Sequence, residues 1–293
     1  MANLKQIKRR ITSVASTQQI TKAMKMVAAA KLRKAQEAIL LARPYALRLQ
    51  EALASLAAGQ EADSHPLLAR RDGGDARRPH STRVCYLVVT ADRGLCGSFN
   101  SAVIKRAQQL LAEAPAGQES LLYLVGKKGA DFFRSRPVEA VGRRVGLFNR
   151  LNFGDAVSIG QDLTALFEQG RIDRVVLVFN EFKSAIQQVL HTDQLLPVVL
   201  EEGGPAHPAP ALCEPPAAAL LDHLLPLYVN RIVWRVLLDS HAAEQGARMT
   251  AMESATDNAS EMIADLTLQY NRTRQAAITQ EIAEIVGGAA AIQ

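Results

Sequence analysis

Apolar residues recur along the first 57 residues with the alternating three- and four-residue spacing of a coiled-coil helix. The seam comprises positions 4, 7, 11, 14, 18, 21, 25, 28, 32, 35, 39, 42, 46, 49, 53 and 56. Only Gln18, Thr21 and Lys25, which follow one another on the seam, are not apolar. The spacing predicts a helix over 3–57, about 80 Å long at 1.5 Å per residue, kinked at Pro44. A helix of this length needs a partner helix to bury its seam.

A second helix-forming stretch runs from Leu220 to Ile285 and is interrupted by only one glycine and one proline. Its apolar stripe passes through Met249, Met252, Ala255, Ala259, Met262 and Leu266. We therefore predict an antiparallel coiled coil between the two ends of the chain. Pro226 favours a clean helix that begins just after it. Around residues 16–31 the core consists of Ala, Met and Ser/Thr, so this part of the coiled coil should be thin.

The middle of the chain has the pattern of a small α/β domain with a partly parallel sheet. Apolar strand patterns lie in "VCYLVVTADRGLCGSFN" (84–100), "LLYLVGKKGADFF" (121–133), "RVVLVFNEFKS" (174–184) and "QQVLHTDQLLPV" (187–198). Helical patterns at 101–113 and 155–169 alternate with them. The predicted class is α+β, a long antiparallel coiled coil plus a central α/β, Rossmann-like domain. The predicted segments are a helix (1–57), a linker (58–82), the domain (83–200), a second linker (201–219) and the C-terminal coiled-coil helix (220–293).

Composition and charge fit slim, complementary helices. Hydrophobic residues make up 48% of the chain but aromatic residues only 5%, so Ala, Leu and Val supply the apolar mass. Residues 1–48 hold 11 Lys or Arg and one acid, whereas residues 239–293 hold 8 acids and 3 Arg. The two ends are electrostatically complementary, and the excess of positive charge predicts an additional acidic protein partner.

No catalytic, cofactor or metal site is evident in the sequence. The turn "TADRGLCGSFN" lacks the Lys-Ser/Thr of a P-loop, "VGKKGADFF" fails the same test, and no GxGxxG or GxSxG occurs. We interpret the turn as one that needs positive φ beside a strand end. The six histidines have no metal-ligand spacing and are expected to be mostly solvated. Cys85, Cys96 and Cys213 form no CxxC pair, which favours a reducing compartment.

Two classes of function would make different use of these segments. An enzyme built on the central domain would bind a phosphate at the turn of 92–98. A nucleic-acid-binding arm could use the basic first helix, but Tyr45 is the one aromatic residue in its sequence, and an acidic helix of the same chain is available to pair with it. No apolar run reaches the length of a membrane span, so direct membrane insertion is not expected.

Several motifs are similar to those of the gamma subunit of F-type ATP synthases. These are "TQQITKAMKMVAAAKLRKAQ" (17–36), the stretch from "RMTAMESATDNASEMI" to "EIVGGAAA" (248–291), and "DRGLCGSFN" (92–100). The resemblance implies a rotor shaft without bond chemistry of its own, turned by proton flow inside the ring of alpha and beta subunits to drive ATP synthesis. It also implies that the α/β domain lies beside the epsilon subunit and the c-subunit ring.

The resemblance also implies particular contact residues. Met24 lies in the seam break facing the beta subunit, with Lys22 and Lys25 beside it. Near the same level on the C-terminal helix, Arg274, Gln275 and Thr279 touch the beta subunit as well. The tip of the shaft lies in an apolar bearing and comprises Ala289, Ala290, Ala291, Ile292 and Gln293.

The expected location is the cytoplasmic side of a bacterial inner membrane, as a peripheral subunit, because no transit-like presequence precedes the first helix. Thiol gating as in the chloroplast members should be absent, since Cys213 lacks a close cysteine partner.

Overall fold

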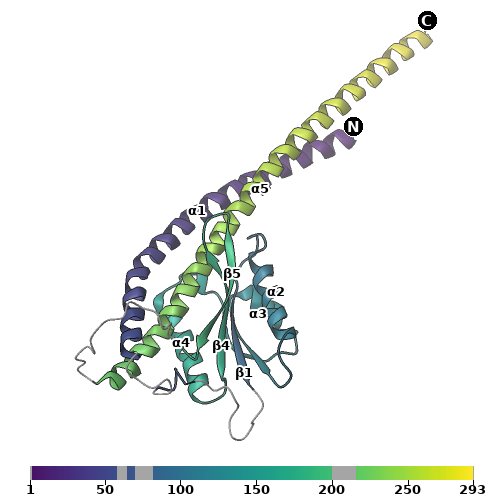
Figure 1. Cartoon of the computed structure of the whole chain (residues 1–293). Helices are drawn as coiled ribbons and strands as arrows, with labels where there is room; N and C mark the ends of the chain where they lie inside the picture. The colour runs from purple at the N-terminus through teal and green to yellow at the C-terminus, as the bar shows by residue number, and fades with distance from the viewer. Residues whose placement is uncertain (1, 58–64, 70–81, 200–215, 293) are drawn as a thin grey trace. The chain divides into compact units, whose positions relative to one another are not determined.

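The computed structural model describes residues 2–57, 65–69, 82–199 and 216–292 (Figure 1). The two longest helices are α1 (Ala2–Ala57) and α5 (Ala217–Ile292). Both continue through an internal proline, Pro44 in α1 and Pro226 in α5. The prediction that the C-terminal helix begins just after Pro226 is therefore wrong. Leu221, Leu225 and Val229 bury one face of these first turns in a hydrophobic core, and this burial outweighs the local cost of the proline.

The chain divides into two compact units. Unit 1 comprises residues 1–29 and 248–293, and unit 2 comprises residues 30–247. Helices α1 and α5 contribute to both units, so each unit contains one segment of each long helix.

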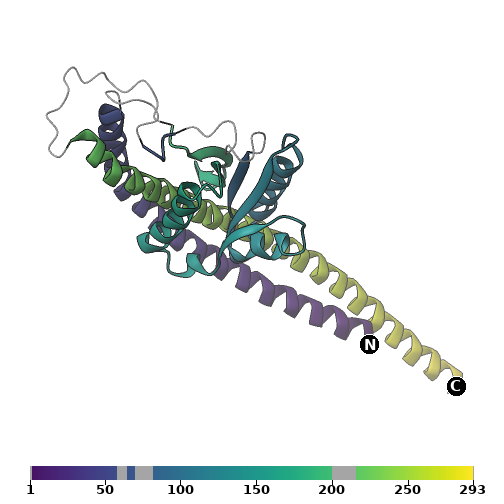
Figure 2. The same ribbon diagram turned by 90° about the horizontal axis from the view of Figure 1, so that it is seen from below.

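Unit 1 is an antiparallel pair of helices. The first part of α1 and the last part of α5 lie side by side in two perpendicular views (Figures 1 and 2). Contacts from Gln18 to Ser260 and from Lys25 to Glu253 run in opposite sequence directions, as an antiparallel pair requires. All eight seam positions of α1 in this unit, from Leu4 to Ala28, are buried or half-buried. The predicted coiled coil is confirmed.

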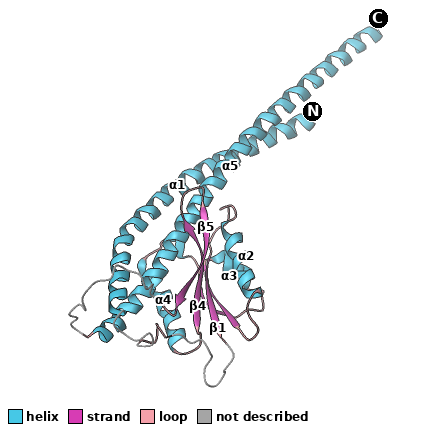
Figure 3. Cartoon of the chain, viewed as in Figure 1, coloured by secondary structure: helices cyan, strands magenta, loops and turns pink. Residues whose placement is uncertain are grey.

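Unit 2 contains a five-stranded sheet in the order β3-β2-β1-β4-β5 (Figure 3). The strands are β1 (Arg83–Val89), β2 (Glu119–Val125), β3 (Ala140–Arg144), β4 (Arg174–Phe182) and β5 (Gln188–Leu196). Only β5 is antiparallel to its neighbour. The predicted partly parallel sheet is thus confirmed.

Alternation along the strands gives the sheet two buried faces. In β1, Val84, Tyr86 and Val88 face one core, and Cys85, Leu87 and Val89 face the other. The first face is covered by α2 (Phe99–Ala112) and α3 (Lys127–Phe133). The opposite face is covered by α4 (Phe153–Glu168) and by the unit 2 part of α5 (Figure 1). The long apolar runs of the strands follow from this double burial.

Strand β3 is absent from the sequence-based prediction. Its sequence, AVGRR, has neither an apolar run nor a clean alternation, because it is the edge strand and is not fully buried. Gly142 within it lies against the ring of Tyr123, where a Cβ atom would be 2.2 Å from the ring carbon Cε2. A short 3-10 helix, η1 (Leu147–Asn149), follows β3.

The predicted linkers fall largely outside the described residues. An exception is the segment 65–69, in which Leu67 is fully buried in the core of unit 2. The Leu67 carbonyl accepts a hydrogen bond of 2.8 Å from the Val198 N–H. The His65 side chain is also buried, with Nδ1 accepting from the Leu67 N–H at 3.0 Å and Nε2 3.4 Å from Asp222. For His65 the expectation of a solvated side chain is wrong.

Candidate functional site

The break in the apolar seam of α1 is occupied by polar pairs that join the two helices of unit 1. Gln18 Nε2 donates to Ser260 Oγ at 2.6 Å, and the hydroxyl oxygens of Thr21 and Thr256 are 2.8 Å apart. Lys25 Nζ lies 2.5 Å from Glu253 Oε1. We call these three pairs the polar ladder. The sequence identified the three non-apolar positions on α1, and the structure shows which residues of α5 they contact.

The candidate contact residues of α1 differ in their surroundings. Lys22 is exposed, and Met24 is half-buried. Lys25 is also half-buried, and its ammonium is held by Glu253 within the same chain. Three large apolar residues of this stretch, Ile20, Met26 and Val27, are more than half exposed. The seam pattern did not identify these three, because they occupy the outward positions of the helix.

The candidate contact residues of α5 are exposed but do not lie level with Met24. Arg274, Gln275 and Thr279 all point to solvent in this chain, and Thr279 Oγ1 donates to the Gln275 carbonyl at 3.0 Å. The partner of Lys25 is Glu253, which lies about 30 Å before Arg274 along a helix with a rise of 1.5 Å per residue. The expectation that these residues share one level is therefore wrong.

The end of α5 carries an exposed apolar surface. Ile278, Ile282, Ile285 and Val286 are each between 47% and 71% exposed, which is unusual for residues of this size. In both views the last turns of α5 extend beyond the start of α1 (Figures 1 and 2). The side chains of the expected tip, Ala289, Ala290, Ala291 and Ile292, and the whole of Gln293 lie outside the described residues.

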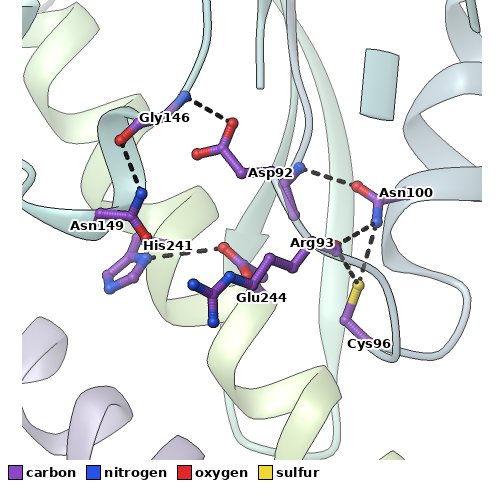
Figure 4. Close-up of polar contacts among 9 residues, drawn as sticks. Asp92, Arg93, Cys96, Asn100, Gly146, Asn149, His241 and Glu244 are labelled. Atoms are coloured by element: carbon purple, nitrogen blue, oxygen red, sulfur yellow. Dashed lines mark hydrogen bonds and ion pairs between the residues drawn. The ribbon is translucent and has the colours of Figure 1, made fainter. Parts of the chain in front are cut away.

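The glycine-bearing turn after β1 is stabilised by side chains of the same chain (Figure 4). Gly97 has φ of 56° and Leu95 of 60°, which confirms the interpretation that the turn needs positive φ. Asp92 Oδ1 accepts from the backbone N–H groups of Lys127 at 3.0 Å and Gly146 at 2.8 Å. The Asp92 carboxylate thus ties the turn to the segments that follow β2 and β3.

The crevice where open α/β sheets usually bind ligands is filled by α5. That crevice lies beyond the carboxyl ends of the strands where the strand order reverses, here between β1 and β4. Ala243 and Ala247 of α5 pack there against Ala91, Cys96 and Phe99. The enzyme hypothesis therefore has no phosphate site in this part of the chain.

Close to the turn, α5 presents His241, which is half-buried, and Glu244, which is buried (Figure 4). The His241 ring stacks on Phe148 with centroids 5.6 Å apart, and its Nδ1 lies 3.8 Å from Glu244 Oε2. His241 is the second histidine for which the expectation of a solvated side chain is wrong. Among the described residues there is no cluster of His, Cys, Asp and Glu that could hold a metal ion.

Another buried acid lies nearby on α5. Burial raises the pKa of Asp239 to about 6, although Arg235, Arg43 and Lys183 act in the opposite direction.

No helix in the described part of the chain is both long and apolar enough to span a membrane.

The chain combines a slim two-helix coiled coil with a doubly wound domain. Its own helix fills the crevice in which such a domain usually binds a ligand. These features define a class of protein that acts through its surfaces. The family model for ATP synthase matches residues 3–292. The ATP synthase gamma chain of Heliobacterium modesticaldum is 49% identical over 300 residues, and that of Chlorobium phaeobacteroides is 46% identical over 297 residues. Each alignment covers 100% of both chains.

Solved structures agree with this match. A chain of the central stalk and c-ring of the Tetrahymena thermophila mitochondrial ATP synthase is 27% identical, with a TM-score of 0.58 over 80% of this chain and 99% of that chain. A chain of the Euglena gracilis mitochondrial ATP synthase is 18% identical and shares the fold, with a TM-score of 0.69 over 99% of this chain and 95% of that chain. The chain belongs to the gamma-chain family of the ATP synthases. It is a non-catalytic subunit, the central stalk of the rotor.

Proposed function

We propose that this chain couples proton flow through the membrane sector to ATP synthesis by turning inside a ring of alpha and beta subunits. The observation that carries the proposal is the full-length match to gamma chains, combined with a unit 1 that is slim and mostly polar at its centre. A shaft of this kind shifts the populations of conformations in its neighbours, because it contacts them differently at each angle. No step of bond chemistry is required of it.

The surface of unit 1 supports a surrounding protein partner. Exposed apolar side chains lie on α1 at Ile20, Met26 and Val27 and on the end of α5 at Ile282 and Ile285. Such residues are rarely left in water over a continuous length. The Lys and Arg side chains of α1 would also attract acidic groups of a neighbouring subunit. Surface ion pairs stabilise a contact by only about 0–1 kcal/mol, which suits a contact that forms and breaks during each rotation of the shaft.

Six residues are proposed as the contact set for the beta subunit. They are Lys22, Met24, Lys25, Arg274, Gln275 and Thr279. Because the two groups lie at different heights on unit 1, we assign them to different parts of the beta subunit. The tip, from Ala289 to Gln293, is proposed to lie in the apolar bearing, which the exposed Ile282 and Ile285 would enter together with it.

The remaining partners are proposed for unit 2. We place the epsilon subunit and the c-subunit ring against this unit, and we place the chain at the cytoplasmic face of a bacterial inner membrane as a peripheral subunit. The gamma chains in the comparison come from bacteria, including Chlorobium phaeobacteroides.

Co-expression with tagged alpha and beta subunits tests the proposal. We expect one copy of this chain to co-purify with three copies of each, and ATP hydrolysis by the complex to depend on it. In membrane vesicles that hold the whole ATP synthase, Arg274→Ala and Lys22→Ala should lower ATP-driven proton pumping, whereas a matched exposed change in unit 2, Arg134→Ala, should leave the alpha–beta assembly intact. A chain that purifies alone and leaves the activity of the alpha–beta ring unchanged would contradict the proposal.

A further inference from the structure

The polar ladder differs from the rest of the seam in which it lies. Gln18, Thr21 and Lys25 occupy three successive seam positions of α1. Apolar residues occupy all the remaining seam positions. Each of the three meets a polar residue of α5 within 2.8 Å. Thr21 is the most buried of the three, with 9% of its surface exposed. Polar residues on a solvated helix face need no partner on the facing helix, whereas each of these three has one.

The flanking seam carries little information about axial register. Its buried residues near the ladder are Ala28 on α1 and Ala259 and Met252 on α5. Two of them are small and alike, and the third is an unbranched side chain that adapts to its surroundings. Small apolar residues pack almost equally well after a shift of one heptad, so they fix the pairing weakly. Polar residues at core positions, by contrast, specify register in coiled coils.

A shift of one heptad would break the ladder in either direction. Thr21 would then lie opposite Ile263 or Met249 in place of Thr256, and its hydroxyl would lose its partner across the seam. Lys25 would lie opposite Ser260 or Gly246 and lose its ion pair with Glu253. Gln18 would still meet a polar residue after either shift, Thr267 or Glu253, whereas Lys25 would meet one after only one shift, and that residue, Ser260, carries no charge. Only the observed register therefore satisfies all three pairs.

We propose that the polar ladder is a register lock that holds α1 at a fixed height against α5. Within it Lys25 is a positioning residue that acts through Glu253 and sets the height of Lys22 and Met24 relative to α5. This refines the proposed function, in which Lys25 was grouped with the residues that contact the beta subunit. The register itself can be measured whatever the partners of unit 1 are.

Disulfide trapping in the complex with alpha and beta subunits reads the register. Thr21→Cys with Thr256→Cys reports the observed register, since the two hydroxyl oxygens are already 2.8 Å apart. Thr21→Cys with Ile263→Cys reports a one-heptad shift. Both pairs are placed in chains that carry Lys25→Glu, Glu253→Lys or both changes.

Each single charge reversal places like charges side by side at positions 25 and 253. We therefore expect the ratio of the observed-register disulfide to the shifted disulfide to fall about three- to fivefold, which is within the range for a partly exposed ion pair. The double reversal restores the opposite charges and should return both yields to those of the native pair. In membrane vesicles that hold the whole ATP synthase with these variants, proton pumping per ATP hydrolysed should fall in the single variants and recover in the double variant.

Lys22→Glu is the matched control, because it makes the same charge change three residues away at an exposed position outside the ladder. It should leave the ratio of the two disulfides unchanged. The proposal is overturned if the double reversal remains as defective as Lys25→Glu, which would place the partner of Lys25 on another chain. It is equally overturned if neither single reversal alters the disulfide ratio. Failure of the proposed function would instead appear as absence of the alpha–beta complex, with the trapping result still readable in the free chain.

Discussion

In unit 2, helices α1 and α5 join α4 in a core of large side chains, and Leu53 of α1, Leu163 of α4 and Val229 of α5 are completely inaccessible to solvent. In unit 1, the buried seam includes Ala28 and Ala259, and Thr21 lies among the buried polar residues. The same two long helices thus take part in a dense core in one unit and a thin, polar seam in the other. Burial follows what the neighbouring element offers, and the change in partner explains why one continuous helix has two kinds of seam.

This difference in packing indicates different roles for the two units. A dense core suits a part that must keep its shape, and a thin seam with fixed register suits a part that must be slim and still present residues at set heights. The following predictions test the contrast, beginning with the change that should affect stability most.

Leu163→Ala should destabilise the chain by about 2–5 kcal/mol, because it leaves a cavity in a packed core. Leu163 contributes to the core beneath the sheet and is fully buried. Urea denaturation of the purified full chain measures the effect. The matched change in unit 1, Met262→Ala, removes a half-exposed side chain and should cost well under half as much. Equal losses at the two positions would contradict the contrast.

Asp173→Ala should cost about 3 kcal/mol, the scale of a buried ion pair that loses one partner. The carboxylate of Asp173 is buried and accepts from Arg83 three times, from the backbone N–H at 2.8 Å and from the guanidinium at 3.0 and 3.1 Å. On the surface of α1, Glu37 pairs with Arg33 in an exposed i,i+4 contact. Glu37→Ala should therefore change the free energy of unfolding by less than about 0.5 kcal/mol, measured in the same denaturation experiment.

Asp239→Asn should stabilise the chain at pH 8 by about 1–3 kcal/mol. Burial raises the pKa of Asp239 to about 6 from an ordinary value of 3.8, so the folded chain binds this proton more tightly than the unfolded chain does. Ionisation therefore destabilises the fold progressively as pH rises from about 4 to above 6. Arg235, Arg43, Lys183 and Glu181 are the charged groups that face it.

The test of this pH dependence is the difference in unfolding free energy between the native chain and Asp239→Asn at several pH values. The stabilisation should be full at pH 8 and disappear near pH 4. A difference that does not vary over this range would show that ionisation of Asp239 is not the cause.

The smallest expected effect lies in unit 1. Replacing both Thr21 and Thr256 by Val removes both hydroxyls of a matched pair, together with their contacts to the carbonyls of Gln18 and Met252. The removal of both side-chain partners at once is close to neutral in stability, within about 0.5 kcal/mol. Thermal unfolding of the full chain measures this. A loss of several kcal/mol would mean that the polar ladder stabilises unit 1 strongly, contrary to its proposed role in specifying register.

Much of this fold could be predicted from the sequence. The seam of α1 and the strands β1, β2, β4 and β5 carry strong periodic or apolar signals. Strand β3 escaped prediction because an edge strand with the sequence AVGRR has almost no such signal. Helix α5 was expected to start after Pro226, because a local rule about proline cannot take account of the burial of Leu221 and Leu225.

The candidate site was predictable in kind but not in geometry. Periodicity identified Gln18, Thr21 and Lys25 as exceptions, yet it gives no axial register between two helices, so their partners on α5 could not be named. For the same reason Arg274 was expected near the level of Met24, although Lys25 pairs with Glu253. The burial of His65 and the partial burial of His241 accompany contacts with the Leu67 backbone N–H and the Phe148 ring, which sequence spacing does not reveal.

The most direct test of the central claim is to watch the chain rotate. Alpha and beta subunits are assembled with this chain and immobilised, and a bead is attached to a cysteine introduced at the exposed Ser135 of unit 2. On addition of ATP the account predicts rotation in one direction, at a speed that follows the rate of hydrolysis. A bead that stays still while the complex hydrolyses ATP at its full rate would contradict the account.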